Sequence, residues 1–213
     1  IDWAAGRDLA FRIGQQKVHF DRQTIISSSE LQFVDRATVI GSFQLDRDIG
    51  IALHSEDLFG LDGRLAYVLG VYGGEGRGRL AAPAGFLYLA RVEVKPFGDF
   101  DAWVEADLER SKRARLSIGG AVAWNEDAVR TFGNRGAPVA EALGLEAFAG
   151  FDYLHLEADA IFKWSGLSIL AEFLWQRAQD EARVAEVDGE RIVVRPHDGW
   201  GWFAQAGQMI GSH

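Results

Sequence analysis

Two segments of this chain alternate apolar and polar side chains over long stretches. Residues 85–95 place Phe86, Tyr88, Ala90, Val92 and Val94 on one face and Arg91, Glu93 and Lys95 on the other. Residues 153–164 alternate Leu154, Leu156, Ala158, Ala160, Phe162 and Trp164 with Tyr153, His155, Glu157, Asp159, Ile161 and Lys163. This is the period of a β-strand. Soluble strands are about five or six residues long, whereas membrane-spanning strands need about 9–11. The pattern favours a transmembrane β-barrel.

Composition agrees with this interpretation and narrows the function classes. The chain has 213 residues, of which 48% are hydrophobic, and we expect one domain over residues 1–213. It contains no run of the ~20 apolar residues that a membrane helix needs. It has no cysteine, which excludes disulfides, thiol catalysis and cysteine-based zinc sites. A net charge of -9 is the opposite of what a nucleic-acid binder carries, so we expect no nucleic-acid partner.

Similar alternation divides the rest of the chain into strands and connections. Further strands are predicted over residues 8–18, 48–54, 64–71, 115–124, 167–176 and 199–210. The count is about eight long strands, joined alternately by short turns and by long loops over residues 19–47, 73–85, 125–150 and 179–198. Within these loops, Pro138 to Leu145 could hold a helical turn, and residues 190–195 could extend a strand. Short turns on one side and long loops on the other are typical of an outer-membrane barrel.

Aromatic side chains lie near the ends of these predicted strands. They are Tyr88, Trp124, Phe162, Trp164, Trp175, Trp200 and Trp202. On a membrane barrel they would form the aromatic girdles at the two interfaces. The alternative is that they are core residues of a soluble barrel.

Several sequence segments of the chain, in the same order, resemble the phosphate-selective porin O and P family. The resemblance rests on residues 12–15 (RIGQ) with Lys17, His19-Phe20, Arg22-Gln23, residues 33–36 (FVDR), 45–50 (LDRDIG), 70–76 (GVYGGEG), 90–94 (ARVEV) and 199–203 (GWGWF). It implies a water-filled, antiparallel barrel of sixteen strands in the outer membrane of a Gram-negative bacterium. Such a barrel passes small anions such as phosphate and is commonly a homotrimer.

The chain departs from this family pattern in two ways. Only about half of the sixteen strands can be found, and residues 209–213 (MIGSH) lack the terminal aromatic residue that closes such barrels. We therefore expect a part of a longer barrel. The net charge of -9 does not suggest an anion channel, although selectivity depends on charges at the constriction.

The alternation also predicts which side chains face the pore. Arg12, Arg91, Lys95 and Arg115 could form a basic strip that steers anions; alternatively, acidic neighbours neutralise them on a solvated face. Phe86, Tyr88, Val92, Leu154, Leu156 and Phe162 should face lipid. The small residues Gly50, Ala52, Ala66, Gly70, Gly119, Ala121 and Ala123 fall on the inner face and predict a wide lumen.

Residues 19–47 are the best candidate for a loop that folds into the barrel. Arg22, Arg36 and Arg47 could line a constriction, and Ser27, Ser28 and Ser29 could donate hydrogen bonds to an oxyanion. Arginine suits phosphate because its planar fork binds two oxygens at once. The alternative is an external loop in which these arginines pair with Asp21, Asp35, Asp46 and Asp48.

Patterns for catalysis are weak. His155, Glu157 and Asp159 share a strand face, but their spacing matches no standard metal motif. Residues 73–78 (GGEGRG) lack the Gly-Lys-Ser/Thr ending of a phosphate loop, and Ser27 to Ser29 lack a nucleophile-elbow context. We expect no enzyme activity, no metal and no cofactor.

The expected function is passive diffusion of small hydrophilic solutes, with a preference for anions, across an outer membrane. The alternatives are a soluble β-barrel that binds an apolar ligand and a closed structural barrel without a pore.

Overall fold

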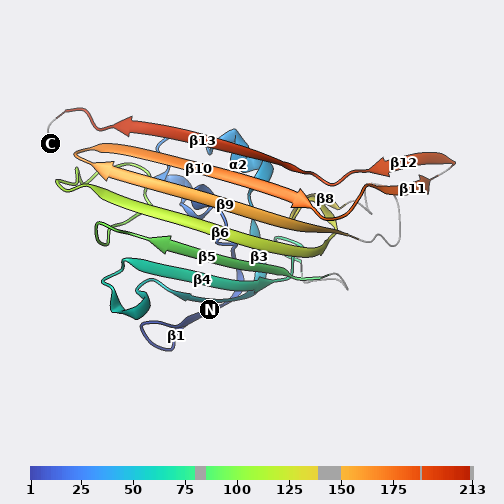
Figure 1. Ribbon diagram of the computed structural model, residues 1–213, viewed down its shortest axis with the longest axis horizontal. Helices are drawn as coiled ribbons and strands as arrows, with labels where there is room; N and C mark the ends of the chain where they lie inside the picture. Colours follow the sequence, from blue (N-terminus) through green and yellow to red (C-terminus); the bar gives the residue numbers. More distant parts are fainter. Residues whose placement is uncertain (80–84, 139–149, 188, 212–213) are drawn as a thin grey trace.

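The computed structural model of the protein describes residues 1–79, 85–138, 150–187 and 189–211. Its main feature is one nine-stranded sheet with the order β1-β2-β3-β4-β5-β6-β9-β10-β13 (Figure 1). The strands are β1 (Asp2–Ala4), β2 (Ala10–Lys17), β3 (Arg47–Ser55), β4 (Leu65–Tyr72), β5 (Leu87–Val94), β6 (Arg115–Ala128), β9 (Phe151–Trp164), β10 (Leu167–Ala178) and β13 (Gly199–Gln208). Every neighbouring pair is antiparallel.

The all-β prediction is confirmed, and each of the eight predicted segments corresponds to one strand, although β6, β9 and β10 are longer than predicted. The match is closest at the hairpin of β9 and β10, where Ser165 and Gly166 form the connection. Both residues have positive φ angles, 52° and 86°. This left-handed pair is what a two-residue hairpin turn needs to match the twist of its strands. The remaining strand of the sheet, β1, is short and was not predicted.

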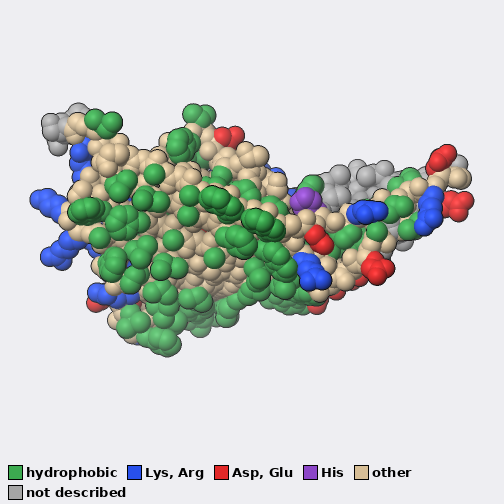
Figure 2. Space-filling model, turned by 45° about the horizontal axis from the view of Figure 1, so that its top comes forward, with side chains coloured by type: hydrophobic (Ala, Val, Ile, Leu, Met, Phe, Trp, Pro, Cys, Tyr) green, Lys and Arg blue, Asp and Glu red, His purple; other side chains and the backbone are tan. Residues whose placement is uncertain are grey.

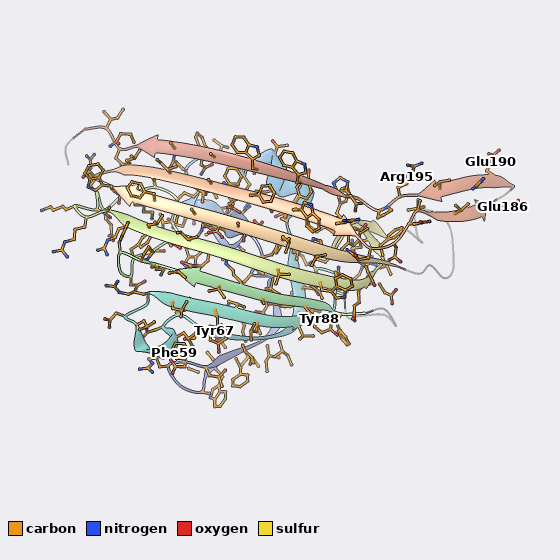
Figure 3. All side chains as sticks on the ribbon, in the orientation of Figure 1. Phe59, Tyr67, Tyr88, Glu186, Glu190 and Arg195 are labelled. Carbon is orange, nitrogen blue, oxygen red and sulfur yellow. The ribbon has the colours of Figure 1, made fainter. Side chains whose placement is uncertain are left out.

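The sheet is open at both edges. Among the described residues, β1 pairs only with β2, and β13 pairs only with β10. Two small hairpins stand apart from it: β7 (Arg130–Phe132) with β8 (Arg135–Pro138), and β11 (Arg183–Val187) with β12 (Glu190–Val194). The predicted strand over residues 190–195 belongs to the second hairpin, which projects beyond the sheet and carries Glu186, Glu190 and Arg195 (Figure 3).

Short helical turns complete the described chain. They are α1 (Arg22–Ile25), η1 (Ser28–Glu30), α2 (Thr38–Phe43) and η2 (Leu58–Gly60). No helix in the described ranges has the length and apolar composition needed to cross a membrane. In the helical turn predicted from Pro138 to Leu145, Pro138 instead ends β8, and the other residues lie outside the described ranges.

The connections differ between the two ends of the strands. At one end, called here the turn end, the strands are joined through residues 56–64, 95–114 and 165–166. At the other, called the loop end, they are joined through residues 18–46, 73–86, 129–150 and 179–198. Figure 3 places Phe59 and Tyr67 toward the turn end and Tyr88 toward the loop end.

The two faces of the sheet are opposite in character. The outer face is apolar and exposed, with Val92 50% and Trp202 65% accessible. Figure 2 shows hydrophobic side chains spread over the sheet, while charged side chains gather at its two ends and on the projecting hairpin. Phe86, Tyr88 and Leu156 lie on this face as predicted, and Arg91, His155 and Asp159 lie on the other.

Two inward segments cover the inner face. They are residues 18–46, from the loop end, and residues 95–114, from the turn end. The first contributes Val18, Phe20, Ile40 and Leu45 to a core that also contains Leu87 and Leu174 of the sheet. Of residues 19–47, which were expected to fold into a barrel, residues 19–46 lie against the polar face of the open sheet and bury it, and Arg47 begins β3.

The small residues of the inner face have a different role from the predicted one. A Cβ atom on Gly70 would lie within 2.7 Å of the Tyr72 ring, and one on Gly119 would collide with Arg91 and Asp159. These glycines make room for large side chains. Small residues here therefore do not indicate an empty lumen.

Candidate functional site

A pocket of 420 Å³ at the loop end collects an excess of positive charge. We call it the basic pocket. It is lined by Lys17, Thr24, Ser27, Ser28, Arg36, Gln44, Asp46, Arg47 and Arg77. Four of these side chains are cationic and one is anionic. The single carboxylate, Asp46, is engaged by Arg77 at 3.2 Å.

The sheet itself places two of the cations side by side. Lys17 is the last residue of β2, Arg47 is the first of β3, and the register sets them directly opposite each other. Like charges at directly opposed positions destabilise an antiparallel pair. The fold therefore keeps an unfavourable pair of cations at this strand end.

Lys17 and Arg36 also hold the wall of the pocket in place. The Lys17 ammonium donates to the carbonyl oxygens of Thr24, Ile25 and Ile26 at 2.7, 2.8 and 3.2 Å. Arg36 donates from Nε to the Gln23 carbonyl at 2.8 Å and from Nη2 to the Ile26 carbonyl at 2.9 Å. These contacts satisfy carbonyls at the C-terminal end of α1, which a helix leaves without partners.

Arg47 is the cation best placed to bind a ligand. Within the described ranges, no hydrogen bond or ion pair holds its guanidinium, whereas Lys17 uses all three of its protons on carbonyls. The Nη1 group of Arg36 is likewise without a protein acceptor among these residues. Guanidinium groups beside the hydroxyls of Ser27 and Ser28 suit the oxygens of a small oxyanion.

The structure brings together part of the predicted constriction. Arg36, Arg47, Ser27 and Ser28 all line the basic pocket. Ser29 lies beside it, with its hydroxyl 2.9 Å from that of Ser27.

Arg22 is separate from this group, because its side chain is buried in the interior. Its Nε donates to Asp159 at 2.5 Å, its Nη1 to the Ala102 carbonyl at 3.1 Å and its Nη2 to Ser117 at 2.8 Å. Nearby, Asp21 accepts from the Thr24 amide at 2.8 Å and begins α1. Burial raises the pKa of the Asp21 carboxyl above its ordinary value.

The alternative for this loop required its arginines to pair with neighbouring aspartates. In the described part of the chain, the guanidinium groups of Arg22, Arg36 and Arg47 form no ion pair with Asp21, Asp35, Asp46 or Asp48. The alternative is therefore wrong for these three side chains.

The four residues of the predicted basic strip, Arg12, Arg91, Lys95 and Arg115, each have a partner in the protein. Arg12 pairs with Asp2 at 2.7 Å, and Lys95 pairs with Asp99 at 2.6 Å. Arg91 pairs with Glu157 at 2.8 Å and also with Asp159. Arg115 donates to the Asp99 carbonyl at 3.1 Å. Acidic side chains thus compensate Arg12, Arg91 and Lys95, as the alternative expected, but Arg91 and its partners are buried and do not lie on a solvated face.

No metal centre is found among the described residues. His155, Glu157 and Asp159 share the inner face of β9, but the described residues contain no group of three His, Cys, Asp or Glu side chains placed to hold an ion. Asp159 instead serves Arg22 and Arg91.

Two cations of the basic pocket, Lys17 and Arg77, were not predicted as site residues. The sequence contained a signal for Lys17. If the first two long strands, which residues 19–47 connect, form an antiparallel pair, Lys17 at the end of one lies opposite Arg47 at the start of the other. Arg77 lies in a glycine-rich loop, lines the pocket and pairs there with Asp46. Comparisons with protein-family models, with curated proteins and with solved structures found no match to the chain.

Proposed function

We propose that this protein is an outer-membrane β-barrel channel for the passive diffusion of small anions. The described sheet would form part of the barrel wall, with its outer face against lipid. The observation that carries the proposal is the sidedness of the sheet. Long strands expose apolar side chains outward and keep charged side chains inward, which is the distribution that a membrane barrel requires.

A closed barrel would need further strands. Neighbouring strands are antiparallel throughout the sheet, so the first and ninth strands, β1 and β13, run in the same direction. An all-antiparallel barrel has an even number of strands. Strands that closed such a barrel between β13 and β1 would then be odd in number. A homotrimer remains a prediction from the family resemblance.

The basic pocket supports a preference for anions. It lies where the strands meet the long loops, so a solute entering at the loop end would meet Arg36 and Arg47 first. Charges in a confined, partly desolvated site act on an ion more strongly than charges on a wide, wet wall. Phosphate-like oxyanions are the class that arginine forks and serine hydroxyls serve best.

The runner-up, a soluble barrel that binds an apolar ligand, needs the apolar strand faces to point inward. Those faces point outward, with Val92 and Trp202 both half exposed or more. The other alternative, a closed structural barrel without a pore, is distinguished from a channel by measuring conductance.

Membrane insertion and conductance test the proposal directly. The full-length protein, reconstituted into liposomes, should float with the lipid in a density gradient and resist extraction by high salt. In a planar bilayer it should give ohmic current steps. A protein that stays soluble without detergent, or one that inserts but passes no current, would contradict a channel.

Reversal potentials in a salt gradient test the assignment of the anion preference. Replacing both Arg36 and Arg47 with Gln should move the reversal potential away from the anion limit. The matched control is Arg113→Gln with Arg115→Gln, which removes two charges that do not line the basic pocket. Equal shifts in the two double variants would assign the preference to total charge instead of the pocket.

A further inference from the structure

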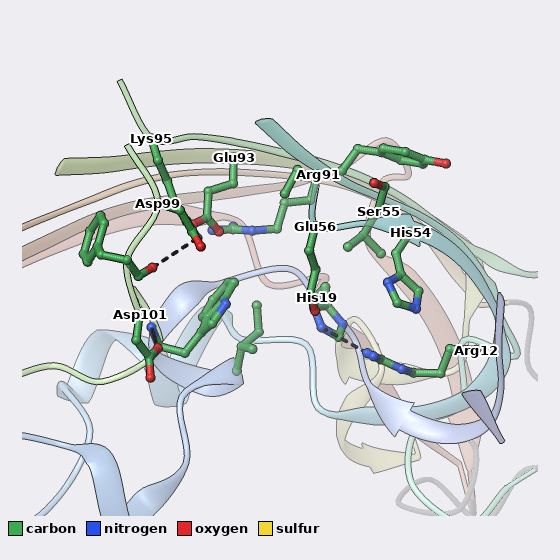
Figure 4. Close-up of a pocket in the computed structure, with 16 residues that line it drawn as sticks. Arg12, His19, His54, Ser55, Glu56, Arg91, Glu93, Lys95, Asp99 and Asp101 are labelled. Carbon is green, nitrogen blue, oxygen red and sulfur yellow. Dashed lines mark hydrogen bonds and ion pairs between the residues drawn. The ribbon is translucent and has the colours of Figure 1, made fainter. Parts of the chain in front are cut away.

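A second cavity lies on the inner face at the turn end of the sheet. Its volume is 510 Å³, and it includes Ser55, Glu56, Ala66, Lys95, Asp99 and Trp103 in its lining (Figure 4). These residues come from the ends of β3 and β5, the start of β4 and the second inward segment. We call it the turn-end cavity. The basic pocket therefore lies at one end of the strands, and this cavity lies at the other.

One stretch of chain separates the two cavities. In residues 17–28, Lys17, Thr24, Ser27 and Ser28 line the basic pocket, whereas His19 and Ile25 line the turn-end cavity. Adjacent residues Thr24 and Ile25 thus face opposite cavities. The wall between them is one segment thick at this point.

The wall is held rigidly on its far side. Arg22 donates to Asp159 and Ser117, and the Gln23 amide donates to Glu172 at 2.8 Å. These partners belong to β6, β9 and β10, and all are buried. The inner face is therefore filled on that side, while both cavities are lined by residues of β2 and β3, and the turn-end cavity also by residues of β4 and β5.

The two cavities differ in charge. The basic pocket holds four cations and one carboxylate. In the turn-end cavity, Arg12, Arg91 and Lys95 each have an acidic partner. His19 adds no charge near neutral pH, because burial, reinforced by Arg12 and Arg91, lowers its pKa to about 4. A solute would meet its strongest electrostatic selection at the loop end.

We propose that the two cavities are the two vestibules of one solute path along β2–β4, opening to opposite sides of the membrane, with Ile25 at its narrowest point. The inference rests on the proposed channel function and adds its route, its barrier and its direction. Arg36 and Arg47 select the ion in the loop-end vestibule. Ile25, together with the carbonyl contacts of Lys17, limits the current.

Sided thiol modification tests the route, because the chain has no cysteine of its own. Ser28→Cys places a thiol in the basic pocket, and Ala66→Cys places one in the turn-end cavity. A negatively charged methanethiosulfonate reagent is added to one side of a planar bilayer that contains the full-length protein. We expect each thiol to react from one side only, the two from opposite sides, and each reaction to lower the current.

Truncation of Ile25 tests the barrier. Ile25→Ala should raise the single-channel conductance by about twofold or more, since current is limited at the narrowest point. The matched control is Ile40→Ala, which truncates a buried isoleucine of the same inward segment that lines neither cavity. Its conductance should stay at the native level.

The results of these experiments distinguish a wrong route or a wrong barrier from a wrong channel function. A protein that conducts while both thiols react from the same side, or while their modification leaves the current unchanged, overturns the route. Equal conductance in the Ile25→Ala, Ile40→Ala and native proteins overturns the barrier. If neither the native protein nor Ile25→Ala conducts, the channel function itself falls, and the inference falls with it.

Discussion

Arg22 should be the side chain that fixes the first inward segment on the sheet. It is fully buried and links this segment to three strands, through Asp159 on β9, Ser117 on β6 and Glu93 on β5. Replacing it with Met keeps much of the apolar volume and removes the charge. The perturbation therefore reports on the ion pair and its hydrogen bonds more than on packing.

The expected loss of stability follows from these contacts. Removing one partner of a buried ion pair costs about 3–5 kcal/mol, because the other charge is left buried without compensation. Asp159 retains Arg91 as a second partner, which lowers the cost. The lost hydrogen bonds to Ala102 and Ser117 add roughly 1 kcal/mol each. We expect Arg22→Met to lower the free energy of unfolding by about 3 kcal/mol or more.

Urea unfolding in detergent micelles, followed by tryptophan fluorescence, measures this loss. The control is Arg113→Met, an exposed arginine for which a change within about 0.5 kcal/mol is expected. A loss below about 1 kcal/mol in Arg22→Met would show that the segment is held by its apolar contacts instead. The same variant should conduct more and select anions less, because Arg36 belongs to this segment and is bonded to it.

Three further outcomes are expected. In a membrane, Lys95→Cys should react with a water-soluble thiol reagent faster than Val94→Cys, because residue 95 lies on the inner face and residue 94 on the outer face. The reverse order of labelling would show that the assignment of the two faces is wrong. Brominated lipids should quench the exposed Trp202, and unchanged fluorescence would remove that strand from the lipid boundary. His19 has a pKa lowered from 6.5 to about 4. As the pH falls, the unfolded chain therefore binds a proton at His19 before the folded chain does. The free energy of unfolding should fall by up to roughly 3 kcal/mol between pH 6.5 and pH 4. Urea midpoints at pH 7 and 4.5 should show a smaller fall for His19→Gln.

The burial of the inner face changes how sidedness can be measured. His155 and Glu157 point inward as the alternation predicts, but the inward segments cover them completely or nearly so. A cysteine at either position would be shielded from reagent, so slow labelling there would say nothing about facing. Lys95 is a better reporter because it borders the turn-end cavity.

Half of the candidate site could be predicted from the sequence. Arg36, Arg47, Ser27 and Ser28 share one loop whose length and polarity indicated a role in the pore. Lys17 and Arg77 lie outside that loop and join it only when β2, β3 and the loop after β4 meet at one end of the sheet. Arg22 has the same local context as Arg36, and no local pattern distinguishes a buried arginine from a pocket arginine.

The sequence by itself determined where the strands run and which way their side chains face. Period-two alternation is a local property, because successive side chains of an extended chain point to opposite faces whatever lies beyond them. Only the tertiary structure decided what covers the inner face and which charges remain free. Arg22 and Asp159 are 137 positions apart, and pairing over that distance depends on how the whole sheet curves around the inward segments.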